Sequence, residues 1–233
     1  MNPRIRILGI SGSPRSNSNT AILVKAALKE AERIGEVETE FVSLHGKKIN
    51  PCVACYQCPV EETICVQRDD MTEIYPRLFD ADGIILGAPV YFGTINAQTK
   101  ALMDRCRPFG LLGRPLQFKV GGAIAVGGGR HSGQEAAIQA IRTFFIMSRM
   151  LQVGSVTGPI GVAGVAWKEG TITQDTWLSG IRGEQSTIDV ARELGKLVAV
   201  VTKIVVAGKQ IIQLDKYDLN IGGLRRLEKN RLG

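Results

Sequence analysis

Apolar residues recur along this chain in two alternating patterns: short β-rich runs and longer stretches with helical spacing. The short runs predict strands at residues 4–10, 37–44, 83–90, 120–126 and 155–160. The longer stretches predict helices at residues 20–34, 71–79, 96–106, 134–151 and 185–207. The runs at 83–90 and 120–126 are apolar nearly throughout, as expected for strands buried on both faces of a parallel sheet. The alternation of strands and helices predicts an α/β fold with a doubly wound parallel sheet.

Two segments do not fit this alternation. Residues 161–183 form a long connection without clear periodicity, which is typical of a lid, an insertion or an interface arm. Trp167 and Trp177 lie in it, and either cover apolar surface or belong to an interface. Residues 208–233 are basic and irregular, and we expect a solvated or subunit-wrapping extension. The chain therefore divides into a domain at 1–207 and a C-terminal extension at 208–233.

The composition predicts a globular cytoplasmic protein that binds neither membranes nor nucleic acid. Of the 233 residues, 44% are hydrophobic, but no apolar run reaches the length of a membrane span. Five cysteines without a secretory signal pattern indicate a reducing compartment. The formal net charge of +7 suits an acidic redox partner or a phosphorylated cofactor. No recognition helix or nucleic-acid module is present in the sequence.

Four of the five cysteines lie within fourteen residues, and this array is the most informative motif of the chain. They are spaced C-x2-C-x2-C-x6-C, at Cys52, Cys55, Cys58 and Cys65. Four thiolates on one short segment are what a [4Fe–4S] cluster needs, and the first three resemble the bacterial ferredoxin pattern. Structural zinc sites usually pair two separate C-x2-C units across a longer gap. Zinc, or a redox-active or vestigial cysteine loop, stays open as an alternative, whereas disulfides between such close cysteines would be strained.

The loop between the first strand and the first helix has the composition of a phosphate site. A helix N-terminus offers free N–H groups and a partial positive charge. Its spacing matches neither G-x-G-x-x-G nor G-x4-G-K-[ST], which excludes the dinucleotide and nucleoside triphosphate fingerprints. The alternative is a plain helix cap with a polar loop. The candidate ligands of a terminal monophosphate are Ser11, Ser13, Arg15, Ser16, Asn17, Ser18 and Thr20.

Two further loops follow the third and fourth strands and are expected at the same edge of the sheet. Their glycines and aromatic residues suit a flat heteroaromatic ring. Of Tyr91 and Phe92, one is expected to face the core. His131 is a candidate proton donor, although a lone loop histidine more often has no catalytic role, and Arg130 suits either the ring or a substrate. The candidate ring-binding residues are Pro89, Val90, Tyr91, Phe92, Gly93, Gly127, Gly128, Gly129 and Arg130.

Four motifs in order give the chain a family resemblance. The stretches GSPRSNSNT, APVYFGTINAQTKALMDR and GGGRHSGQE resemble the flavodoxin-like NADPH-dependent FMN reductase family. With CVACYQC, the later cysteine and DDM added, the chain resembles the iron–sulfur flavoproteins within it. The resemblance covers roughly residues 4–205 and implies a five-stranded sheet in the order 2-1-3-4-5. It also implies FMN at the carboxyl edge, a [4Fe–4S] cluster on the cysteine loop at 50–70, electron transfer between the two, and a homodimer or homotetramer.

The position of the cysteine loop independently supports a pairing of these two centres. The loop leaves the second strand at the same edge as the phosphate and ring loops. NAD(P)H is a candidate electron donor, and ferredoxin or another acidic electron carrier is a candidate partner. Two alternative functions remain at this point: an NAD(P)H-dependent FMN or quinone reductase without a cluster, and a zinc-stabilised interaction protein. No catalytic side chain is predicted beyond the cofactors.

Overall fold

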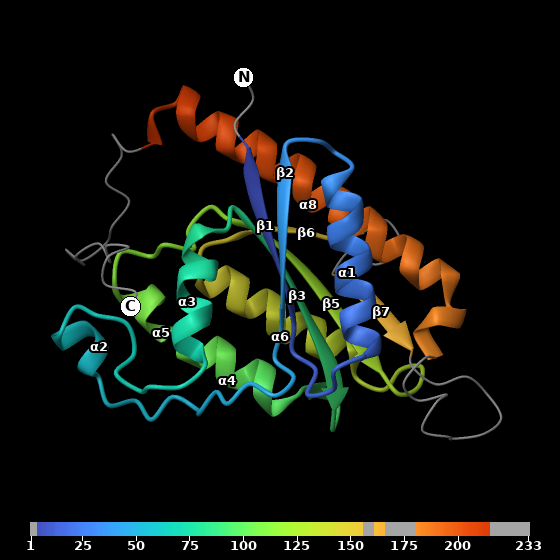
Figure 1. The fold of residues 1–233 in the computed structure, drawn as a ribbon, viewed down its shortest axis with the longest axis horizontal. Coiled ribbons are helices and arrows are strands. Elements are labelled where there is room, and N and C mark those ends of the chain that lie inside the picture. Colours follow the sequence, from blue (N-terminus) through green and yellow to red (C-terminus); the bar gives the residue numbers. More distant parts are fainter. Residues whose placement is uncertain (1–3, 156–160, 166–179, 215–233) are drawn as a thin grey trace.

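Parallel strands form one central sheet in the computed structural model, which describes residues 4–155, 161–165 and 180–214 (Figure 1). These strands are β1 (Ile5–Ser11), β2 (Val37–Ser43), β3 (Gly83–Tyr91), β5 (Val120–Gly127), β6 (Leu151–Val153) and β7 (Val162–Val165). Their order is β2-β1-β3-β5-β6, and β7 also pairs with β5. The predicted doubly wound sheet and its strand order 2-1-3-4-5 are therefore confirmed.

Helices cover both faces of the sheet. The long ones are α1 (Asn19–Glu32), α3 (Met71–Asp80), α4 (Ala97–Arg105), α6 (Gln134–Met147) and α8 (Gln185–Ile211). Short turns of helix are α2 (Gln57–Val60), α5 (Arg107–Leu111) and η1 (Gly180–Gly183). Apolar side chains of α1 and α8 share one core cluster, and those of α3, α4 and α6 share another. The sheet therefore lies between two helical layers.

The two-residue period of the strands explains why both layers are needed. In β1, Ile5 and Ile7 face the α1–α8 layer, whereas Leu8 and Ile10 face the α3–α4–α6 layer. All four side chains are at most 1% exposed. A central strand with apolar side chains on both faces must be covered on both faces, because burial removes each such side chain from water and stabilises the fold by about 1.5–3 kcal/mol.

The fifth sheet position differs from the prediction. Two short strands occupy this position in the described part of the chain: β6 pairs with Val120–Gly122 of β5, and β7 pairs with its Ile124–Gly127 portion. Residues 156–160 lie outside the described part of the chain. The helix expected to reach residue 151 ends at Met147, and β7 lies in the expected connection at 161–183. Strands of three and four residues are too short to show a periodicity, so the sequence pattern missed them. Trp167 and Trp177 fall outside the described residues.

The last helix, α8, is longer than expected and runs past residue 207 to Ile211. The predicted boundary between the domain and the extension thus falls inside a helix, and residues 215–233 lie outside the described part of the chain. Within the described residues, no helix combines the length and apolar character that a membrane crossing requires.

Candidate functional site

Three loops leave the carboxyl ends of β1, β3 and β5 and enclose an open pocket of about 150 Å³. This is the edge at which ligands bind in open α/β sheets. The structure brings nine of the predicted cofactor residues together there: Ser13, Arg15, Ser18, Thr20, Pro89, Val90, Tyr91, Gly127 and Gly128. Asn19 and Val126 also line the pocket and were not among the candidates. Seven candidates lie outside its lining: Ser11, Ser16, Asn17, Phe92, Gly93, Gly129 and Arg130.

The first loop places hydroxyl groups at the N-terminus of α1. Ser18 caps this helix, because its hydroxyl oxygen accepts a hydrogen bond from the backbone N–H of Ala21 at 3.1 Å. Ser13 accepts from the backbone N–H of Arg15 at 3.3 Å, and the Arg15 side chain is exposed at the pocket. The hydroxyl of Ser11 is buried and has no hydrogen-bond partner among the described residues. A helix N-terminus with surrounding donors fits an anionic phosphate group.

Asn96 and Thr99 fix the start of this loop, and the sequence interpretation missed both. The side-chain amide of Asn96 donates to the carbonyl of Gly12 at 2.7 Å, and the hydroxyl of Thr99 donates to Asn96 Oδ1 at 2.6 Å. A Cβ at position 12 would lie 1.8 Å from Thr99 Oγ1, so only glycine fits there. The available signal was the pair of polar residues opening the helix at 96–106.

The second loop is a hairpin turn that directs its aromatic residues outward. Val90 pairs with Ile95 and Tyr91 with Thr94, so β3 turns directly into β4 (Thr94–Ile95). Phe92 and Gly93 form the two-residue turn with φ angles of +47° and +84°, as a type I′ turn requires. Tyr91 is 43% exposed and Phe92 is fully exposed. The expectation that one ring faces the core is wrong, because the hairpin carries both beyond the sheet edge.

The third loop is held by its own polar side chains. Ser132 and Gln134 both donate to the carbonyl of Gly129, each at 2.7 Å, and Gln134 Oε1 accepts from the backbone N–H of Ser132. Gly127 and Gly128 reach the pocket, whereas Arg130 and His131 are exposed on the far part of the loop. Backbone groups, rather than the charged side chains, therefore face the space that a ring would occupy.

The four clustered cysteines line a second, small pocket of about 20 Å³. Cys55 is exposed, Cys58 is buried, and Cys52 and Cys65 are half-buried. Burial raises the pKa of the Cys58 thiol, and the neighbouring Cys65, Cys55 and Cys52 raise it further, because each adds negative charge when ionised. One chain segment thus gathers all four sulfur donors around a common space.

The donor set can be compared with the geometry of each candidate metal centre. Four sulfurs around a single zinc ion stand about 3.8 Å apart, given Zn–S bonds of ~2.3 Å in a tetrahedron. Among the described residues, no three His, Cys, Asp or Glu side chains form a group that could hold one metal ion. A [4Fe–4S] cluster binds each thiolate through a different iron, and so needs four sulfurs around a larger space. The lining of this pocket therefore holds four sulfur donors, the ligand type that both kinds of centre use.

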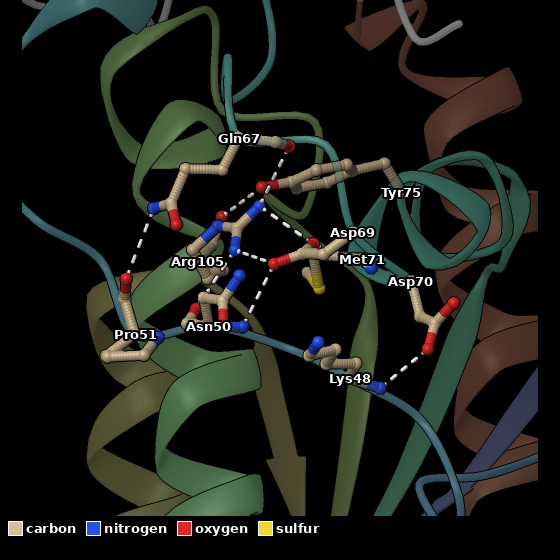
Figure 2. A network of polar contacts seen from close by, with 9 residues as sticks. All are labelled: Lys48, Asn50, Pro51, Gln67, Asp69, Asp70, Met71, Tyr75 and Arg105. Atoms are coloured by element: carbon tan, nitrogen blue, oxygen red, sulfur yellow. Dashed lines mark hydrogen bonds and ion pairs between the residues drawn. The ribbon is translucent and has the colours of Figure 1, made fainter.

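A buried ion pair lies beside Asn50 and Gln67, the residues that flank the cysteine segment (Figure 2). Arg105, at the end of α4, contacts both carboxylate oxygens of Asp69, at 2.6 and 3.1 Å, and the two side chains are 0% and 3% exposed. Burial alone would raise the pKa of Asp69, but hydrogen bonds from Arg105 and two backbone N–H groups hold it below the usual range. Burial alone would lower the pKa of Arg105, but its bonds to Asp69 raise it. Both groups are therefore ionised at neutral pH.

The same network joins several separate parts of the chain. Asp69 also accepts from the backbone N–H groups of Asn50 and Met71, at 2.9 and 3.1 Å. The side-chain amide of Gln67 donates to the carbonyl of Pro51 at 3.1 Å, and the hydroxyl of Tyr75 donates to the carbonyl of Arg105 at 2.7 Å (Figure 2). The sequence interpretation missed Asp69 and Arg105 as site residues. Because 36 residues separate them, no local pattern could have paired them.

Comparison with known proteins identifies relatives over most of the chain. The sequence model of the family described as NADPH-dependent FMN reductase matches residues 5–163. A protein named iron–sulfur flavoprotein from Methanocaldococcus jannaschii is 45% identical over 203 residues, which are 86% of this chain and 99% of the relative. Another of that name from Archaeoglobus fulgidus is 44% identical over 169 residues, 71% of this chain and 84% of the relative. A solved WrbA-like flavodoxin from Agrobacterium tumefaciens shares the fold, with 17% identity and a TM-score of 0.56 over 86% of this chain and 98% of that one.

Proposed function

This chain belongs to the NADPH-dependent FMN reductase family and, within it, to the iron–sulfur flavoproteins, and from this premise we propose that it passes electrons between FMN and a [4Fe–4S] cluster. It is a flavin-dependent oxidoreductase, and FMN is the cofactor of its family. Bound FMN exchanges electrons in pairs or singly and a cluster passes them singly, so the two together connect two-electron and one-electron chemistry.

The pocket at the carboxyl edge supplies the groups that FMN requires. Ser13, Arg15 and Thr20 surround the N-terminus of α1, where a phosphate gains hydrogen bonds and the favourable end of the helix dipole. Pro89 to Tyr91 and the backbone of Gly127 and Gly128 would hold the ring system. The Asn96–Gly12 bond fixes the start of the phosphate loop, which lowers the entropy that cofactor binding would otherwise lose.

The observation that carries the proposal is that Cys52, Cys55, Cys58 and Cys65 all line one pocket. The chain that leads from β2 into the cysteine segment contacts the phosphate loop, because the ring of His45 bonds to the carbonyl of Pro14 at 2.8 Å. The backbone N–H of Leu44 donates to the carbonyl of Ser11 at 2.9 Å. The two candidate cofactor sites therefore belong to adjoining loops, as electron transfer between them would require.

Anaerobic purification of the wild-type protein and two cysteine variants tests the proposal. We expect flavin absorption with broad additional absorption from the cluster, together with iron and acid-labile sulfide, in the wild-type protein. Cys55→Ser should lose iron and sulfide and keep FMN, because the two sites use different loops. Cys106→Ala is the matched control, since burial raises the pKa of the Cys106 thiol to about 12 and this cysteine lies outside both pocket linings. Unchanged iron in Cys55→Ser would contradict the assignment.

A second candidate function is a flavin or quinone reductase without a functional cluster. It is favoured by the family match itself, whose description specifies NADPH and FMN and no metal centre. The same experiment separates the two, because this candidate predicts flavin absorption alone in protein purified and reconstituted without oxygen. A wild-type protein with bound zinc in place of iron would instead indicate a structural metal on the cysteine segment.

A further inference from the structure

We propose that Arg105 is a positioning residue for the metal centre: it ties together the two ends of the cysteine segment and donates its remaining N–H to a sulfur of that centre. This inference rests on the proposed function. It assigns a role to a residue that lies 40 positions beyond the last clustered cysteine and ligates nothing itself.

The ends of the cysteine segment meet at one guanidinium group. Arg105 Nη1 donates to the carbonyl of Asn50 at 2.9 Å, and Nη2 donates to the carbonyl of Gln67 at 3.3 Å (Figure 2). Asn50 stands two residues before Cys52, and Gln67 stands two residues after Cys65. One side chain thus closes the loop that carries all four thiols.

Asp69 holds the guanidinium in this orientation. Its two carboxylate oxygens accept from Nη1 and Nη2, and one of them also accepts from the backbone N–H of Asn50. A planar guanidinium matches this two-point contact, whereas a lysine ammonium is a point charge without a fork. Both side chains are almost fully buried, so the pair is a fixed support rather than a surface contact.

The count of donors leaves one N–H of Arg105 without an acceptor. A guanidinium has five N–H bonds, and the four on Nη1 and Nη2 account for the contacts to Asn50, Gln67 and the two Asp69 oxygens. The fifth, on Nε, is buried and has no partner among the described residues. A buried donor without an acceptor destabilises the folded state, so such a group is rarely left without a partner.

The pocket beside Arg105 supplies the acceptor. Arg105 lines the same pocket as the four cysteines, and Asp104, which also lines it, pairs with Lys100. A thiolate or sulfide sulfur there would accept the Nε–H bond, and hydrogen bonds to sulfur are one of the means by which a protein sets the potential of an iron–sulfur cluster. Arg105 would therefore affect both where the thiols stand and how readily the centre accepts an electron.

Four variants test the two parts of this proposal. Arg105→Gln removes the positive charge and the paired Nη donors. Arg105→Lys keeps the positive charge but not the paired donors, and Asp69→Asn removes the negative charge that holds the guanidinium. Arg107→Gln is the matched control, because Arg107 also lines the pocket but stacks on the Tyr56 ring, at 4.6 Å, and within the described part of the chain it does not join the two ends of the cysteine segment. The variants are compared in the full-length protein, with metal removed and with metal reconstituted.

In metal-free protein, hydrogen exchange reports the tie alone. We expect amides between residues 50 and 67 to exchange at least about tenfold faster in Arg105→Gln and Arg105→Lys than in the wild type, because local opening no longer breaks the bonds of the guanidinium fork. Arg107→Gln should exchange at the wild-type rate. Equal exchange rates in all the variants would contradict the claim that Arg105 joins the ends of the segment, whether or not the wild type binds a cluster.

In reconstituted protein, the midpoint potential reports the bond to sulfur. Loss of a buried positive donor should make the potential more negative in Arg105→Gln, whereas loss of the negative charge in Asp69→Asn should make it more positive. Arg105→Lys keeps the positive charge but loses the Nε–H donor, so its potential should lie between those of the wild type and Arg105→Gln, while its amides still exchange fast. A merely structural role would not shift the potential in opposite directions, so unchanged potentials overturn this part. A wild-type protein that binds no cluster overturns this part together with the proposed function, and the exchange result still decides the tie.

Discussion

Gly12 lies where the phosphate loop, β3 and the start of α4 meet. Its N–H donates to the carbonyl of Gly87 at 2.7 Å, and its own carbonyl accepts from Asn96. Thr99 Oγ1 occupies the space that a side chain at position 12 would need. The contact between Gly12 and Thr99, which lie 87 positions apart, therefore sets the conformation of the loop together with the loop's own sequence.

We expect Gly12→Ala to destabilise the protein by about 1–3 kcal/mol and to weaken FMN binding, because the new methyl group overpacks a buried site. The double variant Gly12→Ala with Thr99→Ala should recover part of this loss, since it removes the closest atom. Urea unfolding of the single and double variants, with and without FMN, measures the coupling. Strictly additive effects would show that the two positions do not interact.

Among the residues that the structure describes, Arg15 is the only charged side chain that lines the pocket of about 150 Å³. Arg15→Ala should weaken FMN binding by about 1.5–3 kcal/mol, the usual contribution of a hydrogen bond to a charged group. Riboflavin, which lacks the phosphate, should bind the variant and the wild type equally. Flavin fluorescence titration measures both, and Arg33→Ala, whose side chain pairs with Glu30 on the exposed face of α1, is the control. An equal loss of affinity for both flavins would place Arg15 at the ring instead.

At the scale of the elements, Lys119 joins the end of α3 to the start of β5. Its ammonium donates to the carbonyl of Phe79 at 2.6 Å and also to that of Ala81, groups that the helix itself leaves without partners. Burial lowers the pKa of Lys119 to about 8, while nearby Asp82 acts in the opposite direction. The element boundary therefore contains a group that titrates in the folded state at a lower pH than in the unfolded state.

The stability of the wild type relative to Lys119→Met should rise as the pH increases from 8 to 10.5. In this range the unfolded lysine holds its proton and the folded one has released it, so the unfolded state binds more protons and a rise in pH favours folding. A shift of this size corresponds to about 3 kcal/mol at most. Urea unfolding of both proteins at pH 7 and pH 10 measures the difference, and other groups that titrate are common to both. A constant difference would mean that the carbonyl contacts keep the ammonium charged.

How far the sequence predicted each element depended on its length. Strands of seven to nine residues, such as β1 and β3, were located to within a residue or so, because their burial on two faces gives a continuous apolar run. The three-residue β6 and four-residue β7 carry no such signal. The hydroxyl residues of the pocket were predicted because helix N-termini bind phosphate, and its glycines because ligands bind at the carboxyl edge of such sheets. Asn96, Asp69 and Arg105 were missed because they act through contacts that only the folded chain creates.

At the scale of the whole molecule, charge and exposure suggest how electrons arrive. The chain has a formal net charge of +7, and Cys55 is exposed at the surface. We propose that an acidic one-electron carrier such as ferredoxin reduces the protein faster than NADPH does, because opposite net charges raise the rate of encounter.

We expect the rate of reduction by ferredoxin to fall about tenfold between low and high ionic strength, as screening shortens the range of the attraction. Stopped-flow absorbance measures this rate. Photoreduction by a neutral deazaflavin is the control for effects of salt on the centres themselves, and should change little. A fast reaction with NADPH, together with a ferredoxin rate that does not respond to salt, would favour the reductase without a cluster.

The closed cysteine loop has a thermodynamic consequence. Bringing together the ends of a flexible segment of roughly 17 residues costs about 2.5 kcal/mol in chain entropy. Because Arg105 joins Asn50 to Gln67, this cost is met when the scaffold folds, before any metal is present. Metal binding then has to order only the interior of the segment. Residues added or removed between Cys58 and Cys65 would change the interior of the loop, whereas its ends at Asn50 and Gln67 would stay joined by Arg105.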